Sequence, residues 1–203
     1  MAIKYIKSGM LDGHHYVVKR ILSEIQIMRH LTQMKENVHT VKMLDLIVSE
    51  NCSNIFIVMN YVQNDLKNAL KQNKNGLTEE LTTGILFKLL CALSFLHRAN
   101  VMHRDLKPGN ILIDQDLTLL ICDFGLARTS RKVETTKKDY SRENMAQKLI
   151  SIRPGLQSVK RELSNHVVTR PYRPPEIIIL EKKYKNTVDL WSTGCILAEM
   201  IFQ

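Results

Sequence analysis

One predicted hairpin with polar ends constrains this chain more than any other feature. Two short apolar runs, 111–113 and 117–121, enclose the polar turn 114–116, which is the pattern of a two-stranded hairpin. Residues 103–110 read HRDLKPGN before it, and residues 123–125 read DFG after it. Because the two outer ends of a hairpin lie together, we expect Asp105, Asn110 and Asp123 to converge.

These converging residues favour chemistry on phosphate. Three oxygen-bearing side chains and Lys107 would share one small site. Carboxylate and amide oxygens suit Mg²⁺, which binds a few of them together with phosphate oxygens. Phosphoryl transfer needs that metal, a positive charge near the transferred group and a carboxylate near the attacking hydroxyl.

Elsewhere the chain mixes helix and strand patterns. Residues 16–34 predict a helix whose buried face is Val18, Ile21, Leu22, Ile25 and Met28. Residues 2–6, 41–48 and 55–59 predict strands. The sequence therefore predicts an α+β fold.

Two further helices follow. For residues 77–98, Thr78 is a good N-cap, and the predicted buried stripe is Leu81, Ile85, Leu89, Leu93 and Leu96. Residues 187–202 are apolar nearly all round, which predicts a helix in the middle of a core.

The motifs resemble those of the protein kinases, and the resemblance covers the whole chain. Lys4, after Ala2 and Ile3, resembles the strand lysine that holds the α- and β-phosphates of ATP. Glu24 resembles its partner glutamate on the first long helix. Helical spacing supports this independently, since Glu24 borders the apolar face of that helix.

The resemblance implies a bilobal kinase fold. The expected divisions are an N-lobe remainder at 1–60, a hinge at 61–65 and part of the C-lobe at 66–203. The family's glycine-rich loop normally precedes the strand lysine, and this chain begins three residues before Lys4. We therefore expect a fragment, with an incomplete N-lobe sheet and an incomplete helical C-lobe.

The resemblance also implies a role for each site residue. Asp105 would accept the proton of the substrate hydroxyl, Lys107 would steady the γ-phosphate, and Asn110 and Asp123 would hold Mg²⁺. Lysine two places after Asp105 is the Ser/Thr-kinase pattern. The residues expected to bind the nucleotide are Lys4, Met59 as gatekeeper, Asn60, Tyr61 and Val62 at the hinge, Asp65 near the ribose and Leu112 beneath adenine.

Later motifs resemble the CMGC group, and within it the mitogen-activated kinases. These motifs are ICDFGLAR at 121–128, VVTR at 167–170 and VDLWS at 188–192. The residues implied to form a pocket for proline after the phosphorylated residue are Val167, Val168, Thr169 and Arg173. The resemblance thus implies protein substrates with Ser/Thr-Pro. The activation segment, 123–176, is about twice the usual length because of a basic insertion near 130–160. Pro171 and Pro174 replace the usual tryptophan and alanine.

The resemblance suggests regulation by phosphorylation. Arg20, Arg104 and Arg128 occupy positions that gather round a phosphate in related kinases. Ser164 aligns with the family's phosphothreonine, which implies an upstream activating kinase. A site within the insertion, or constitutive activity, stays open as an alternative.

The charge distribution and the cysteine spacing bear on the partners and the location of the protein. Residues 128–161 carry ten basic and three acidic residues, most of the net charge of +9, and we expect a solvated loop rather than a nucleic-acid surface. The four cysteines show no paired spacing, which favours free thiols and a cytoplasmic or nuclear protein. No run approaches about 20 apolar residues, so we expect no membrane partner.

Two functions follow for comparison. The first is an ATP- and Mg²⁺-dependent serine/threonine kinase, favoured by the retained Lys4, Glu24, Asp105, Asn110 and Asp123. The alternative is a truncated kinase or pseudokinase that acts as a non-catalytic binding or scaffold module.

Overall fold

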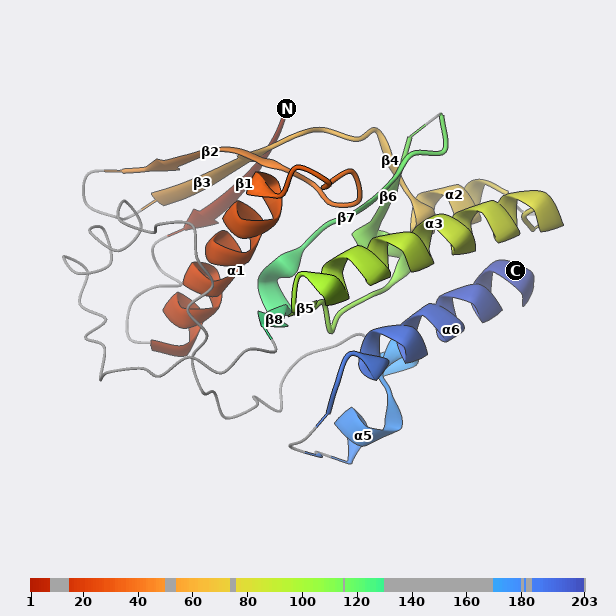
Figure 1. Ribbon diagram of the computed structural model, residues 1–203. Coiled ribbons are helices and arrows are strands. Elements are labelled where there is room, and N and C mark those ends of the chain that lie inside the picture. Colours follow the sequence, from red (N-terminus) through yellow and green to blue (C-terminus); the bar gives the residue numbers. More distant parts are fainter. Residues whose placement is uncertain are drawn as a thin grey trace.

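The computed structural model describes residues 1–7, 15–49, 54–73, 76–114, 116–129, 170–179, 181 and 184–202. A sheet backed by helix α1 lies at one end, and helices α2, α3 and α6 lie at the other (Figure 1). The chain passes between the two ends after residue 59. The α+β prediction is confirmed, whereas the boundaries at 61–65 stay a prediction.

The first sheet contains β1 (Ala2–Lys7), β2 (Met43–Val48) and β3 (Asn54–Met59). Its order is β1-β3-β2, with both pairs antiparallel. Strand alternation puts Ile55 and Ile57, both fully buried, on the face toward α1. Tyr5 and Phe56 stack on the opposite face, with ring centroids 5.0 Å apart. The three predicted strands are therefore confirmed within two residues at each end.

Helix α1 (His15–Gln33) supplies the other half of this core. The five residues predicted to form its buried face are all buried. The same helical spacing brings Glu24 to the buried side, where only 4% of the residue is exposed. An acidic side chain in that position needs a cation, and this requirement ties α1 to β1.

Helix α3 (Glu79–Arg98) begins as predicted, because the Thr78 hydroxyl accepts a hydrogen bond from Leu81 N at 3.3 Å. The predicted stripe is wrong at its first position, since Leu81 is 36% exposed. Thr82 is buried there instead, one turn before Ile85. Because an α-helix has 3.6 residues per turn, a stripe of residues spaced by four moves gradually round the helix. At this end of α3, Leu81 lies beside the buried face rather than on it.

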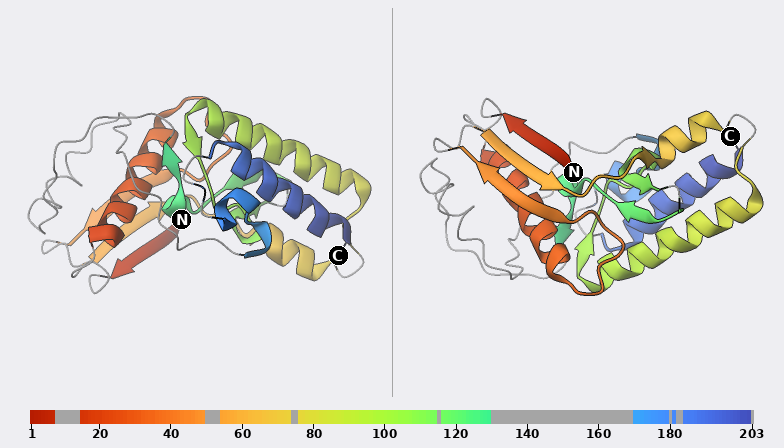
Figure 2. Two further views of the ribbon diagram at one scale, coloured as in Figure 1. Left: turned by 90° about the horizontal axis from the view of Figure 1, so that it is seen from below. Right: turned by 90° about the horizontal axis from the view of Figure 1, so that it is seen from above.

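Helix α6 (Thr187–Phe202) packs alongside α3 (Figures 1 and 2). The described residues bury one face of this apolar helix, since Leu190, Trp191, Ile201 and Phe202 are exposed, so the predicted place in the middle of a core holds for that face only. Its buried face includes polar Asp189, Ser192 and Thr193. Thr193 Oγ1 donates to Asp189 O four residues earlier, whereas Ser192 Oγ lies 3.1 Å from Val188 O within the helix and 2.8 Å from Tyr172 O outside it. Asp189 and Ser192 therefore both bond outside the helix.

The predicted hairpin is formed by β6 (Ile111–Ile113) and β7 (Leu119–Ile121), with Ile111 opposite Ile121. Strand β7 begins two residues later than predicted, because Leu117 takes a left-handed φ of 57° in the turn. Strand β4 (Asn64–Asp65) adds to the free edge of β6, and β5 (Val101–Met102) pairs with β8 (Arg128–Thr129). Helix α2 (Leu66–Gln72) follows β4, and α5 (Pro175–Ile178) precedes α6. The described residues also include the 3-10 turns η2 (Pro108–Asn110), η3 (Phe124–Leu126) and η4 (Arg170–Tyr172).

Two sequence expectations concern composition. Cys91, Cys122 and Cys195 are free thiols, as predicted for the described cysteines. By length and hydropathy alone, α3 would be able to cross a membrane, which the search for apolar runs did not indicate. In this fold, six of its side chains are buried along one face, and helices of soluble proteins can pass the same test of length and hydropathy.

Adjacent leucines in α3 test this packing. Leu89 is fully buried and Leu90 is 43% exposed. Leu89→Ala should lower the free energy of unfolding by about 2–5 kcal/mol, because it leaves a cavity. The matched control, Leu90→Ala, should lower it by less than about 1 kcal/mol. Urea denaturation measures both, and equal losses would contradict the helix register.

Candidate active site

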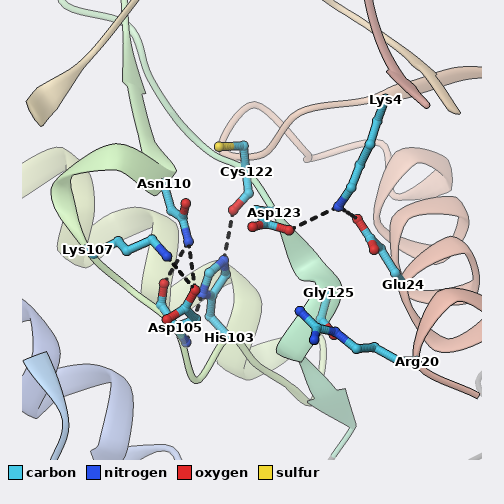
Figure 3. A network of polar contacts seen from close by, with 10 residues as sticks. All are labelled: Lys4, Arg20, Glu24, His103, Asp105, Lys107, Asn110, Cys122, Asp123 and Gly125. Atoms are coloured by element: carbon cyan, nitrogen blue, oxygen red, sulfur yellow. Dashed lines mark hydrogen bonds and ion pairs between the residues drawn. The ribbon is translucent and has the colours of Figure 1, made fainter. Parts of the chain in front are cut away.

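The predicted convergence at the hairpin is observed. Cys122 N donates to Asn110 O at 3.0 Å, which joins the two outer ends of the β6–β7 pair. Asn110 Nδ2 donates to Asp105 O at 2.8 Å and lies 3.3 Å from Asp105 Oδ2. Lys107 Nζ lies 2.9 Å from the same Oδ2 (Figure 3). Asp105 is thus held from two directions through its backbone and one carboxylate oxygen.

Asp189 holds the loop that carries Asp105. Its Oδ2 accepts from His103 N at 2.9 Å, and its Oδ1 accepts from Arg104 N at 2.7 Å. His97 Nε2 lies 2.9 Å from Oδ2 as well. Sequence reasoning missed this role. The available signal was an acidic residue on the buried face of an otherwise apolar helix.

Lys4 links β1, α1 and the residue after β7. Its Nζ lies 2.5 Å from Glu24 Oε1 and 3.1 Å from Asp123 Oδ1 (Figure 3). Burial alone would lower the pKa of Lys4, but the two carboxylates outweigh burial and raise it. Burial alone would raise the pKa of Asp123, but Lys4 outweighs it and holds that pKa below its ordinary value. Both groups are therefore charged at neutral pH.

The three residues Asp123, Phe124 and Gly125 are fixed individually. Phe124 is fully buried and meets the His103 ring edge-on at 5.4 Å. A Cβ on Gly125 would lie only 3.3 Å from Glu24 Oε2, Asp123 Oδ1 and Arg20 Nη2. The absence of a side chain at Gly125 thus lets the ends of these three side chains approach closely, and a Cβ would oblige them to shift by a few tenths of an ångström.

The three arginines predicted to surround a phosphate reach one short segment. Arg20 Nε donates to Gly125 O, and Arg104 Nε donates to Leu126 O, each at 2.8 Å. Arg128 Nη1 donates to the Ala127 carbonyl at 3.1 Å. The structure therefore brings the three residues to consecutive carbonyls, and their role toward a phosphate stays a prediction.

The residues predicted to bind the nucleotide lie on both sides of the chain crossing. Met59 ends β3, and Leu112 is the middle residue of β6. The Asn60 side chain accepts from Lys42 N at 2.7 Å, while Tyr61 is exposed and Val62 half-buried. Asp65 is the N-cap of α2, and one of its oxygens accepts from Asn68 N at 2.8 Å. That cap was not predicted.

Some predicted residues lie outside the described part of the chain: Ser164, Val167, Val168, Thr169 and the basic insertion near 130–160. Arg173 is described, and it lies half-buried between η4 and α5. Pro171 lies in η4, and buried Pro174 is the N-cap of α5. Tyr172, between the prolines, bonds to Glu199 of α6 through its hydroxyl.

The polar atoms at the hairpin fit a hard cation. Asp105 Oδ1 is buried and has no hydrogen-bond partner within the described structure. Asn110 directs its Nδ2 at Asp105, so its amide oxygen points the other way (Figure 3). Asp123 adds a carboxylate. These oxygen donors are of the kind that Mg²⁺ binds together with phosphate oxygens. The described residues contain no group of three or more His, Cys, Asp or Glu side chains that could hold a metal ion by themselves.

Comparison with known proteins agrees with this geometry. The model of the protein kinase domain family matches residues 1–203. Mitogen-activated protein kinase spm1 of Schizosaccharomyces pombe is 36% identical over 185 residues, 91% of this chain and 38% of that protein. Mitogen-activated protein kinase 6 of Oryza sativa subsp. japonica is 35% identical over 204 residues, 99% of this chain and 45% of that protein.

The chain belongs to the protein kinase domain family. Within it, the chain is a CMGC-type kinase domain that resembles the mitogen-activated protein kinases. It spans less than half the length of these two relatives.

Cys122 offers a test of the site's electrostatics. Burial, with the neighbouring Asp123 charge, raises the pKa of its thiol from 9.0 to about 12. Because the thiolate is the reactive species, iodoacetamide at pH 8 should alkylate Cys122 at least about tenfold more slowly in the folded protein than in urea. Mass spectrometry of the peptide gives both rates, and Cys122→Ser identifies the signal. Equal rates would contradict the raised pKa.

Proposed function

We propose that the protein transfers the γ-phosphoryl group of Mg·ATP to serine or threonine hydroxyls of protein substrates. The observation that carries this proposal is the meeting of Asp105, Lys107 and Asn110 with the Lys4–Glu24–Asp123 ion-pair network at one hairpin. No described residue favours the non-catalytic alternative, since each of these positions keeps a functional side chain.

The side chains divide the work between nucleotide and nucleophile. Lys4, aligned by Glu24, binds the α- and β-phosphates, and Asn110 and Asp123 hold Mg²⁺. When bound, the metal neutralises charge on the phosphate oxygens. Asp105 orients the attacking hydroxyl and takes its proton through Oδ1, while Lys107 steadies the γ-phosphate.

The adenine would lie between β3 and β6. Met59 would limit its depth, the backbone at Asn60, Tyr61 and Val62 would bond it, and Leu112 would pack beneath it. Asp65 would contact the ribose with whatever capacity its capping bond to Asn68 leaves.

Specificity and regulation complete the proposal. The family resemblance supports proline after the phosphorylated residue, with Val167, Val168, Thr169 and Arg173 forming that pocket. It also supports an upstream kinase acting on Ser164. The unpaired cysteine spacing supports a cytoplasmic or nuclear location.

Two substitutions in the full-length protein test these chemical roles. Asp105→Asn and Lys4→Met should each lower turnover by about a hundredfold or more, because each removes a positioned charged group. Lys7→Met is the matched control, since Lys7 is exposed on the same strand. Turnover within about threefold of wild type in either site variant would sink the assignment.

A positional-scanning peptide array tests the substrate class. We expect phosphorylation of serine and threonine peptides, with a preference for proline at the next position. The physical basis is a pocket that accepts a residue lacking a backbone N–H donor. Strong labelling without that preference would refute the proline pocket and leave the kinase activity standing.

A further inference from the structure

Arg104, next to Asp105, has an unusual environment. The residue is 9% exposed and takes a left-handed φ of 68°, which a residue with a side chain adopts only when its surroundings hold it there. Its Nε donates to Leu126 O at 2.8 Å. Its Nη1 donates to the hydroxyl of Tyr184.

Both side-chain acceptors of Arg104 are neutral. Within the described part of the chain, no aspartate or glutamate side chain forms an ion pair with its guanidinium. Among the described residues, hydrogen bonds and any π-face nearby are what stabilise this nearly buried cation. Tyr184 supplies both, since its ring centroid lies 5.8 Å from Arg104 Cζ.

Residues 184–189, at the start of α6, therefore bind the loop that carries Asp105 at two points. Asp189 binds the backbone N–H groups of His103 and Arg104. Tyr184, five residues earlier, binds the Arg104 side chain. Two attachments on one residue fix both its backbone and its side chain, and Asp105 is the next residue along.

We propose that Tyr184 is a positioning residue for the catalytic loop, acting through Arg104. The inference rests on the proposed kinase function. The hydrogen bond of Tyr184 goes to Arg104, whereas Lys4, on the proposed nucleotide side of the site, pairs with Glu24 and Asp123. Loss of the hydroxyl should therefore lower kcat and leave KM for ATP unchanged.

The first experiment compares Tyr184→Phe with Tyr5→Phe in the longest natural form of the protein. Tyr5 is the matched control, because its hydroxyl also bonds to one side chain, Asn54, but lies on the outer face of the β1-β3-β2 sheet. Tyr184→Phe should lower kcat about tenfold at constant KM for ATP. Tyr5→Phe should change neither.

Hydrogen exchange supplies a readout that does not depend on turnover. In Tyr184→Phe, the amides of residues 103–106 should exchange faster than in wild type, while amides of α3 should not. If wild type shows no turnover, the proposed function fails, and exchange alone decides the role of Tyr184.

A double-mutant cycle with Arg104→Lys tests the route. Lysine keeps the charge but loses the planar fork that bonds Leu126 and Tyr184 together. If Tyr184 acts through Arg104, adding Tyr184→Phe to Arg104→Lys should change kcat by less than about twofold. The inference is overturned by additive losses, by an equal loss in Tyr5→Phe, by a matching rise in KM, or by unchanged exchange at 103–106.

Discussion

The conformation of the loop that carries Asp105 depends on hydrogen bonds to the buried carboxylate of Asp189. It is fully buried, which is tolerable only because two backbone N–H groups and His97 surround it. Those bonds hold the chain at Arg104 in a conformation that it would otherwise avoid. Because Asp105 follows directly, the direction of its carboxylate is set by a residue more than eighty positions later in the chain.

A second constraint joins α1 to the same region. Arg20 and Glu24 are four residues apart, so they lie on one side of the helix. Arg20 bonds to Gly125 O, and Glu24 bonds to Lys4, which also reaches Asp123. Rotation of α1 would break both bonds together. Gly125 leaves room for this arrangement, since a Cβ there would lie 3.3 Å from the ends of both α1 side chains and of Asp123.

Patterns with a short period could be predicted from the sequence, and so could the site built on them. The hairpin brought Asp105, Asn110 and Asp123 together, and helical spacing placed Glu24 at the buried side of α1. Leu81 was misplaced because periodicity does not say where a core ends. Asp189 and Tyr184 were not predicted because each bonds to a residue far away in the chain. An acidic residue on the buried face of α6 signals that Asp189 needs a partner, but no local pattern identifies the distant loop that supplies it.

The same limit applies to α6. Its composition predicted a place in the middle of a core, yet among the described residues it is buried on one face, and that face carries Asp189, Ser192 and Thr193. Hydropathy counts apolar residues and does not register that a buried hydroxyl can be satisfied by a backbone carbonyl, of its own helix for Thr193 or of a neighbouring turn for Ser192. Polar residues at such positions therefore lower the hydropathy of the buried face, although that face still packs in the core.

The charges of the site residues indicate whether a nucleotide would bind with or without a divalent cation. Two lysines, Lys4 and Lys107, face three carboxylates, Glu24, Asp105 and Asp123, and each lysine is already ion-paired. The cluster thus carries one more negative charge than positive. A bare triphosphate, itself strongly anionic, would meet no uncompensated cation among these five groups. A divalent cation bound with the nucleotide reverses that balance, and Asp123 and the amide oxygen of Asn110 are the ligands such a cation prefers. Under the proposed function, metal and nucleotide would therefore bind together, each making the site acceptable to the other.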